Sequence, residues 1–306
     1  MLRQRDRRKQ VEIMKRLAPL AVLAAGVFWG MMGLFVRTLN AAGLAAMEVV
    51  EVRMLGGLVI VGIYMLIFCP DQFRIRLKDL WCFLGTGVVS VLVFSFCYFR
   101  AMNFTSLSVA AVLLYTAPIF VMLMSILLFR EKLTVRKVLA LILAFVGCVL
   151  VSGIGSDAVV SLPGLLFGVG SGFFYALYSI FGRYAINRGY HSWTITFYSF
   201  LFCVIGGAFL VDWDLITTTI SADYTLLFWI LGMAVVTGFL AYVLYSLGLE
   251  HMESSKASII ASIEPVVGTL LGVFVFREAI TVGGVIGVAL VLGGIAILSV
   301  PGKRQG

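Results

Sequence analysis

The chain carries one sequence unit twice, and this duplication restricts its fold more than any other feature. The tripeptide Phe-Arg-Glu occurs at 129–131 and again 147 residues later, at 276–278. The same register runs without a gap when 98–152 is set against 245–299. A second match, offset by 146 residues, aligns Gly26–Gly43 with Gly172–Gly189. Nearly the whole chain therefore consists of two copies of one structural unit.

The repeated unit has the composition of a membrane protein. Hydrophobic residues make up 61% of the chain, charged residues 12%, and the mean hydropathy is +1.08. A soluble domain of 306 residues cannot bury that much apolar surface in one core. Ten apolar blocks approach the roughly 20 residues that a membrane-spanning helix needs. They lie at 17–36, 46–69, 80–100, 107–129, 138–154, 163–186, 193–211, 224–248, 257–276 and 282–300.

These blocks predict an all-α integral membrane protein with ten transmembrane helices. Long apolar blocks without strand alternation are helices, because hydrocarbon leaves no water to satisfy an unpaired backbone. Basic residues set the orientation. With the N-terminus in the cytoplasm, nineteen Lys and Arg residues fall inside and three fall outside, namely Arg37, Arg100 and Arg277; Arg53 lies within the second span. We therefore expect a multi-pass protein of the cytoplasmic (inner) membrane with both termini cytoplasmic.

An odd number of spans in each half makes the two halves enter the membrane in opposite directions. The predicted organisation is a basic cytoplasmic segment at 1–16, five-helix repeats at 17–160 and 161–300, and a cytoplasmic tail at 301–306. Inverted repeats of this kind are typical of secondary transporters, whose substrate site lies near the bilayer midplane between the halves. The net charge of +8 is therefore interpreted as a topology signal, and nucleic acid is not an expected partner.

Several short patterns resemble the EamA family of the drug/metabolite transporter superfamily. They are Phe28-Trp29-Gly30, Arg100-Ala101-Met102 followed by Ser106 and Ala110-Ala111, Pro118, Glu131, Glu264-Pro265 and Arg277-Glu278. The resemblance implies ten helices, cytoplasmic termini and a central cavity for export or uptake of small metabolites. It further implies that the first, third, fourth, sixth, eighth and ninth helices line that cavity.

Glu264 is the leading candidate for a residue that acts in transport. It lies about eight residues into the ninth predicted helix, where an ionised carboxylate is costly unless it is paired, hydrated or protonated. Helical spacing places it on one face with the small residues at 257, 261, 268 and 272. Two interpretations remain open: a substrate-binding or proton-coupling carboxylate, or a structural acid that bonds backbone groups beside Pro265.

Two prolines occupy matched positions within apolar blocks. Pro118 and Pro265 lack an N–H and release the carbonyls of Leu114 and Ala261, four residues earlier. Helix interruptions at corresponding positions of two halves point to a transporter site. They predict either a gating or helix-breaking role or a passive kink that improves packing.

Aromatic residues also recur at matched positions. Trp29 corresponds to Tyr175, Tyr98 corresponds to Tyr245, and Tyr115 lies one turn before Pro118. Such rings could bind a substrate by stacking or cation–π contacts, and we expect them to line the cavity. The alternative is packing or anchoring at the membrane interface, which is common for Tyr and Trp.

The remaining charged residues are interpreted structurally. Glu48 and Glu51 share a face of the second predicted helix, and either form an external vestibule or belong to a solvated or locally paired helix end. Arg53 points away from that face. Glu131 is predicted to pair with Lys132 or Lys137.

Enzymatic and metal-binding functions find no support in the sequence. The two histidines, His191 and His251, lack a metal-ligand spacing, and the five cysteines form no close pairs. No phosphate-binding glycine loop is present, so no cofactor is expected.

The sequence predicts a non-enzymatic secondary transporter that moves a small metabolite, such as an amino acid or amine, by alternating access. A membrane enzyme or a channel or scaffold is the alternative. The expected partners are a small-molecule substrate, the lipid bilayer and a coupled proton or exchanged solute, in a monomer or homodimer.

Overall fold

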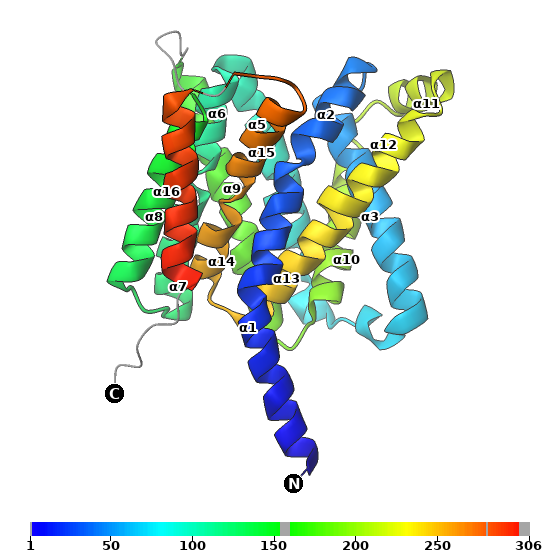
Figure 1. The fold of residues 1–306 in the computed structure, drawn as a ribbon. Helices are drawn as coiled ribbons and strands as arrows, with labels where there is room; N and C mark the ends of the chain where they lie inside the picture. The colour runs from blue at the N-terminus through cyan, green and yellow to red at the C-terminus, as the bar shows by residue number, and fades with distance from the viewer. Residues whose placement is uncertain (1, 154–159, 280, 300–306) are drawn as a thin grey trace.

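The computed structural model describes residues 2–153, 160–279 and 281–299, and it is helical throughout this part of the chain, without strands. The predicted tail at 301–306 and the acidic position 157 lie outside the described residues. The helices form a bundle in which α1 begins and α16 ends on the same side (Figure 1). We call this the N-terminal side of the bundle.

The helices divide between the two halves at the loop that follows α8. The first half contains α1 (Leu2–Gly30), α2 (Met32–Ala41), α3 (Ala46–Phe68), α4 (Leu80–Leu84), the π-helical segment η3 (Gly85–Leu92), α5 (Val93–Phe104), α6 (Leu107–Leu114), α7 (Ala117–Phe129) and α8 (Val135–Val151). The second contains α9 (Leu162–Asn187), α10 (Ser192–Gly207), α11 (Trp213–Ala222), α12 (Leu226–Met233), the π-helical segment η4 (Ala234–Leu240), α13 (Ala241–His251), α14 (Ser254–Ala261), α15 (Glu264–Phe274) and α16 (Val282–Ser299).

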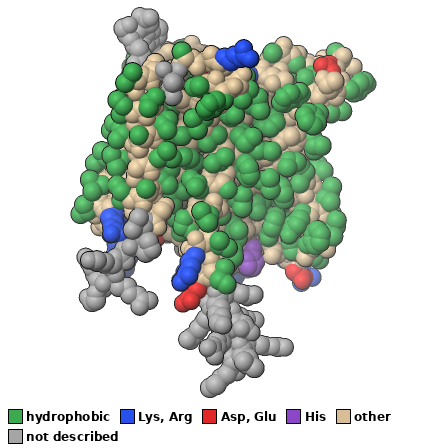
Figure 2. All heavy atoms as spheres, in the orientation of Figure 1, with side chains coloured by type: hydrophobic (Ala, Val, Ile, Leu, Met, Phe, Trp, Pro, Cys, Tyr) green, Lys and Arg blue, Asp and Glu red, His purple; other side chains and the backbone are tan. Residues whose placement is uncertain are grey.

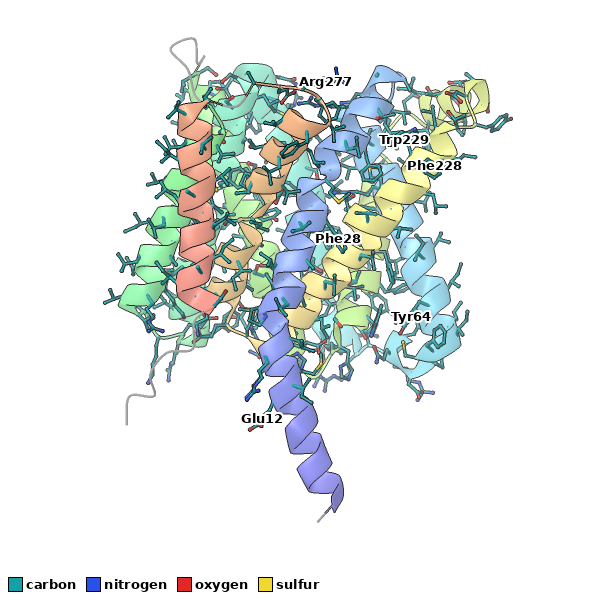
Figure 3. All side chains as sticks on the ribbon, viewed as in Figure 1. Glu12, Phe28, Tyr64, Phe228, Trp229 and Arg277 are labelled. Atoms are coloured by element: carbon teal, nitrogen blue, oxygen red, sulfur yellow. The ribbon has the colours of Figure 1, made fainter. Side chains whose placement is uncertain are left out.

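Eight stretches of the described chain are long and apolar enough to cross a membrane. Hydrophobic side chains cover the middle of the bundle, and charged side chains gather toward its two ends (Figure 2). Glu12 and Arg277 lie at opposite ends, with Phe28 between them (Figure 3). The other two predicted spans correspond to α8, with 17 residues, and α10, with 16. Eight of the ten predicted blocks therefore correspond to helical stretches that are candidates for crossing a membrane.

Two of the spans are interrupted at matched positions, as the prolines predict. The fourth span breaks between α6 and α7, and the ninth breaks between α14 and α15. Pro118 is the second residue of α7, and Pro265 is the second residue of α15. Each proline therefore occupies the first turn of a helix, where its missing N–H removes no intrahelical hydrogen bond.

Two matched glycines pack against these breaks. A Cβ atom on Gly26 of α1 would lie 2.8 Å from the carbonyl oxygen of Ala261. A Cβ atom on Gly172 of α9 would lie 3.1 Å from the carbonyl oxygen of Leu114. Gly26 and Gly172 are counterparts in the duplication, and so are Ala261 and Leu114, which are the two carbonyls that the prolines release. The two halves therefore reproduce one interhelical contact, which requires glycine for close backbone approach.

A second pair of irregularities was not predicted from the sequence. The π-helical segments η3 and η4 lie in the third and eighth spans at corresponding positions of the repeats. A π-helix carries an extra residue per turn and is concentrated at functional sites. Segment η3 leads directly into α5, and η4 leads directly into α13; both helices supply residues to the cavities described below.

The prediction that Glu48 and Glu51 belong to a solvated or locally paired helix end was wrong. Both carboxylates are buried, at 7% and 1% exposure, because α10 packs against α3. Glu48 accepts a hydrogen bond from the backbone N–H of Asp212, at 3.2 Å. Glu51 lies against Gly207 of α10, where a side chain would collide with it. Only the cross-helix packing determines this burial, and helical periodicity carries no information about it.

Candidate functional site

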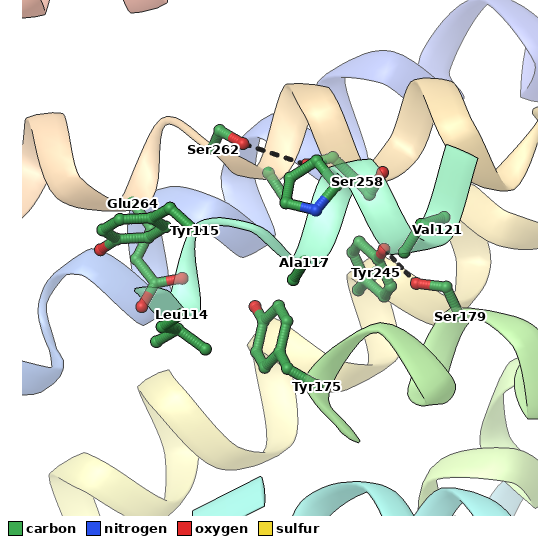
Figure 4. Close-up of a pocket in the computed structure, with 12 residues that line it drawn as sticks. Leu114, Tyr115, Ala117, Val121, Tyr175, Ser179, Tyr245, Ser258, Ser262 and Glu264 are labelled. Atoms are coloured by element: carbon green, nitrogen blue, oxygen red, sulfur yellow. Dashed lines mark hydrogen bonds between the residues drawn. The ribbon is translucent and has the colours of Figure 1, made fainter. Parts of the chain in front are cut away.

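The two helix breaks open onto a common cavity of about 390 Å³, including its mouth (Figure 4). Both broken spans contribute to its wall, together with α9 and α13. The lining residues are Leu114, Tyr115, Ala117, Pro118, Val121, Tyr175, Ser179, Tyr245, Ser258, Ala261, Ser262 and Glu264. The N-termini of α7 and α15 therefore lie at the cavity, and such ends carry unpaired N–H groups and partial positive charge.

A second cavity of about 300 Å³ adjoins the first and shares three lining residues with it. It is lined by Trp29, Ser90, Val91, Phe94, Tyr175, Tyr178, Ser179, Tyr242 and Tyr245. Together the two cavities are lined by residues of the first, third, fourth, sixth, eighth and ninth predicted spans. These are the six helices that the family resemblance implies.

Glu264 lies where the ninth span is broken, as the first residue of α15. Its carboxylate therefore lies in the first turn of a helix, where the helix dipole stabilises negative charge. Tyr175 also lines the cavity beside it (Figure 4), and the Arg53 guanidinium acts on the carboxylate electrostatically. The broken helix thus supplies the local stabilisation that an acid at this depth needs, and it leaves the carboxylate facing the cavity.

Aromatic rings enclose the space beside Glu264. The Trp29 ring lies 5.2 Å from Tyr242, 5.1 Å from Tyr245 and 6.2 Å from Tyr175, measured between centroids. Phe94 contacts Tyr175 edge-on at 5.1 Å. These separations suit edge-to-face packing, which leaves ring faces available to a ligand.

Hydroxyl groups fix two of these rings. The Tyr245 hydroxyl shares a 2.7 Å hydrogen bond with Ser179, and the Tyr178 hydroxyl shares one of 2.9 Å with Ser246. Both bonds join α9 to α13, which are the sixth and eighth spans. They orient the rings before any ligand arrives, which lowers the entropic cost of binding.

The structure places most of the predicted site residues together. Trp29, Tyr115, Tyr175, Tyr245, Glu264 and Pro118 line one cavity or both. Tyr98 lies outside the two linings, although it is close enough to Glu264 to interact electrostatically. Pro265 is buried behind Glu264 and does not line either cavity. Whether these residues bind substrate stays a prediction.

The position of Arg53 near Glu264 was not predicted from the sequence. Its side chain is 3% exposed, its Nε atom has no hydrogen-bond partner, and its Nη1 atom lies 2.7 Å from the Sδ atom of Met32. A thioether is a weak acceptor, so the hydrogen bonding of this buried guanidinium is incomplete. The available signal was an arginine within an apolar span, which by itself indicates function.

Helical spacing could have found two more lining residues. Tyr178 lies one turn after Tyr175 on α9, and Tyr242 lies one turn before Tyr245 on α13. Neighbours at this spacing share a helix face.

Within the described chain, no group of three or more His, Cys, Asp and Glu residues could hold a metal ion.

The two repeats match a known family. The model of the EamA-like transporter family matches residues 16–153 and again residues 162–300. The chain belongs to this family. The match covers both repeats, and it confirms the assignment made from the sequence patterns.

Known proteins are similar in sequence to this chain over nearly its full length. An uncharacterized transporter of Archaeoglobus fulgidus is 31% identical over 282 residues, covering 92% of this chain and 96% of the relative. The uncharacterized transporter YxxF of Bacillus subtilis is 28% identical, covering 95% and 92%. A solved crystal structure has a TM-score of 0.74 at 17% identity and covers 92% of this chain and 95% of that one, so it shares the fold. The EamA chain described here is thus a multi-pass membrane protein of a transporter family.

Proposed function

We propose that this EamA protein is a secondary transporter that moves a small metabolite across the cytoplasmic membrane by alternating access. The observation that carries the proposal is the position of Glu264. Its carboxylate lies at a helix break, beside a matched break from the other repeat, in a cavity that both repeats line. Broken helices at the interface of two repeats are the usual place for the substrate site of a secondary transporter.

The proposed architecture is ten spans arranged as two inverted five-helix repeats, with cytoplasmic termini. In it α8 is the fifth span and α10 the seventh. Helices of 17 and 16 residues reach only about 25 Å at 1.5 Å per residue, so they require slight local thinning of the bilayer. The equivalent contacts of Gly26 and Gly172 support this symmetry.

The chemistry of the cavity favours a substrate with a protonated amine. Glu264 offers an anionic partner, and the surrounding rings offer cation–π contacts worth about 0.5 to 2 kcal/mol each. Arg53 and the N-termini of α7 and α15 offer positive potential for a carboxylate. An amino acid carries an amine for Glu264 and a carboxylate for the positive groups. A simple amine carries only the first. A thermal-shift screen of amino acids and amines on the purified protein identifies which class binds.

Removing an aromatic side chain from the cavity is expected to impair binding without unfolding the protein. Trp29→Ala and Tyr175→Ala should each weaken the affinity for the screened substrate about tenfold, because each removes ring contacts of roughly 1 kcal/mol or more. Titration calorimetry on the purified variants measures the change. Trp229→Ala is the control, since Trp229 packs against Phe35 away from both cavities. Equal loss of folded protein in all three variants would instead assign Trp29 and Tyr175 to packing.

The proposed orientation makes single cysteines accessible from opposite sides. In a protein without its native cysteines, Thr218→Cys should react with an impermeant maleimide in intact cells. Lys78→Cys and Leu133→Cys, which lie in loops at the other end, should react only after the membrane is opened. All three positions are exposed, so a failure to react reports sidedness and not burial. The reverse pattern would reject cytoplasmic termini.

A further inference from the structure

Two glutamates at opposite ends of the bundle have the same local backbone structure. Glu131 follows Arg130, whose φ is 54°, and Glu278 follows Arg277, whose φ is 56°. Glu131 donates its N–H to the carbonyl of Ser125 at 3.2 Å, and Glu278 makes the equivalent bond to Gly272 at 3.0 Å. Each helix end therefore turns its glutamate side chain back over the bundle. The duplication makes these two sites counterparts, one on each side of the cavity.

On the N-terminal side, Glu131 ties the fourth span to the ninth. Its carboxylate accepts hydrogen bonds from the Ser254 N–H at 2.8 Å, and from the N–H and hydroxyl of Ser255, at the start of α14. Lys137 lies 3.3 Å from the same carboxylate. Glu131 and Lys137 are at most 8% exposed. A buried polar network therefore holds the ends of the fourth and ninth spans together on this side.

Arg183 of α9 joins the same network. Its Nε atom donates to the Ser254 hydroxyl at 3.0 Å, and it acts electrostatically on Glu131. The helix carrying Arg183 also lines the cavity. The same network therefore also holds the sixth span on this side.

On the opposite side, Glu278 makes a different and weaker contact. Its carboxylate pairs with Arg37 of α2 at 2.7 Å, and both side chains are about half exposed, at 51% and 52%. Arg37 is the counterpart of Arg183, with its guanidinium also 4.3 Å from the Phe276 ring. An exposed ion pair contributes at most about 1 kcal/mol, whereas hydrogen bonds to a buried charge contribute more. The two ends are thus built from counterpart residues, but the contacts are buried at one end and half exposed at the other.

We propose that Glu131 and Glu278 form two reciprocal seals, and that the structure represents the state in which the N-terminal side is sealed. In the alternate state, Glu278 accepts hydrogen bonds from Leu107 and Ser108 at the start of α6, which are the counterparts of Ser254 and Ser255. Ser108 repeats the hydroxyl that Ser255 provides, and α6 begins on the side of the bundle where α15 ends, just before Glu278 (Figure 1). The alternate state in turn releases Glu131 from α14. This inference rests on the proposed alternating-access function.

A matched pair of serine variants tests the two seals. The reporter is Ala117→Cys, a cavity-lining position, in a protein whose native cysteines are replaced. Its reaction with an impermeant maleimide is measured from each side in vesicles of known orientation. Ser255→Ala removes a hydrogen bond to a charged group and should raise labelling from the N-terminal side about tenfold. Ser108→Ala should lower labelling from that same side about tenfold, because it weakens only the alternate state.

A second matched pair provides the control. Ser152 and Ser299 are also counterparts, and each hydroxyl bonds a carbonyl of its own helix, at 2.8 and 2.9 Å. Ser152→Ala and Ser299→Ala should leave labelling from both sides unchanged. Absence of any effect from Ser108→Ala, or changes of the same sign from Ser108→Ala and Ser255→Ala, would overturn the proposal.

A cross-link tests the alternate contact directly and does not depend on those variants folding. Ser108→Cys combined with Glu278→Cys should form a disulfide on oxidation and block labelling of the cavity from the side opposite the N-terminus. Failure of this pair to cross-link in folded protein would also overturn the proposal. Neither assay uses substrate. Labelling changes of opposite sign in the two serine variants, without measurable substrate flux, would therefore refute the transport function and leave the two seals standing.

Discussion

Glu264→Gln is expected to abolish gradient-driven uptake in proteoliposomes while the protein remains folded. Glutamine keeps the size of the side chain and part of its hydrogen bonding, yet it cannot ionise. If Glu264 carries the coupling proton, binding and exchange should survive, because exchange does not require the proton to be released. If Glu264 pairs with an amine of the substrate, binding should weaken by about 1.5 to 3 kcal/mol, the contribution of a charge-assisted hydrogen bond.

Three assays on one preparation separate these roles: equilibrium binding, exchange and gradient-driven uptake. Glu12→Gln is the matched control, since Glu12 is exposed on the part of α1 that extends below the bundle (Figure 3), and it lines neither cavity. It should match wild type in all three assays. If Glu264→Gln also matches wild type in all three, both roles are eliminated and Glu264 is a structural acid beside Pro265.

Gly26→Ala and Gly172→Ala are each expected to destabilise the protein by about 1 to 3 kcal/mol, the usual cost of overpacking. The added methyl group would collide with the backbone of a broken helix, 2.8 Å from the carbonyl of Ala261 or of Leu113. Alanine favours helix over glycine by about 1 kcal/mol, and this gain only partly offsets the collision. Thermal denaturation followed by loss of monodisperse protein measures the effect. Substrate affinity should fall too, because both breaks line the cavity.

Gly293→Ala is the matched control for these variants. Gly293 lies within α16, and a Cβ atom there would meet nothing within 4 Å. It should unfold at the wild-type temperature or higher, because only the helix propensity changes. Equal stability of Gly26→Ala and Gly293→Ala would show that the close approach to the helix break is unimportant.

The sequence predicts the membrane class, the matched helix breaks and much of the cavity lining because duplication preserves these features in register. Pro118 and Pro265 locate the breaks without any tertiary information, since proline cannot be accommodated in a helix interior without loss. Trp29 and Tyr175 were found because each is aromatic at a position where its counterpart is also aromatic. Their convergence in one cavity follows from the pairing of the two halves.

Features that arise from contacts between helices escaped prediction. The burial of Glu51 depends on a close approach to Gly207 of α10, which no periodicity within α3 reveals. Arg53 was interpreted from its own helix alone, whereas its electrostatic partner Glu264 lies more than 200 residues later in the chain. The π-helical segments have ordinary apolar sequences, and only the packing around them distinguishes them from α-helix.

Counterflow in proteoliposomes tests the central claim of carrier-mediated transport most directly. Vesicles are loaded with a high concentration of the unlabelled substrate found by the thermal-shift screen and are then diluted into a trace of the labelled form. A carrier that exposes one site alternately to each side exchanges internal for external substrate, so labelled substrate should transiently accumulate above its equilibrium level and then decline. Loss of the overshoot in Trp29→Ala vesicles would connect it to the cavity. Monotonic, non-saturable equilibration without an overshoot in wild-type vesicles would indicate a channel and contradict alternating access.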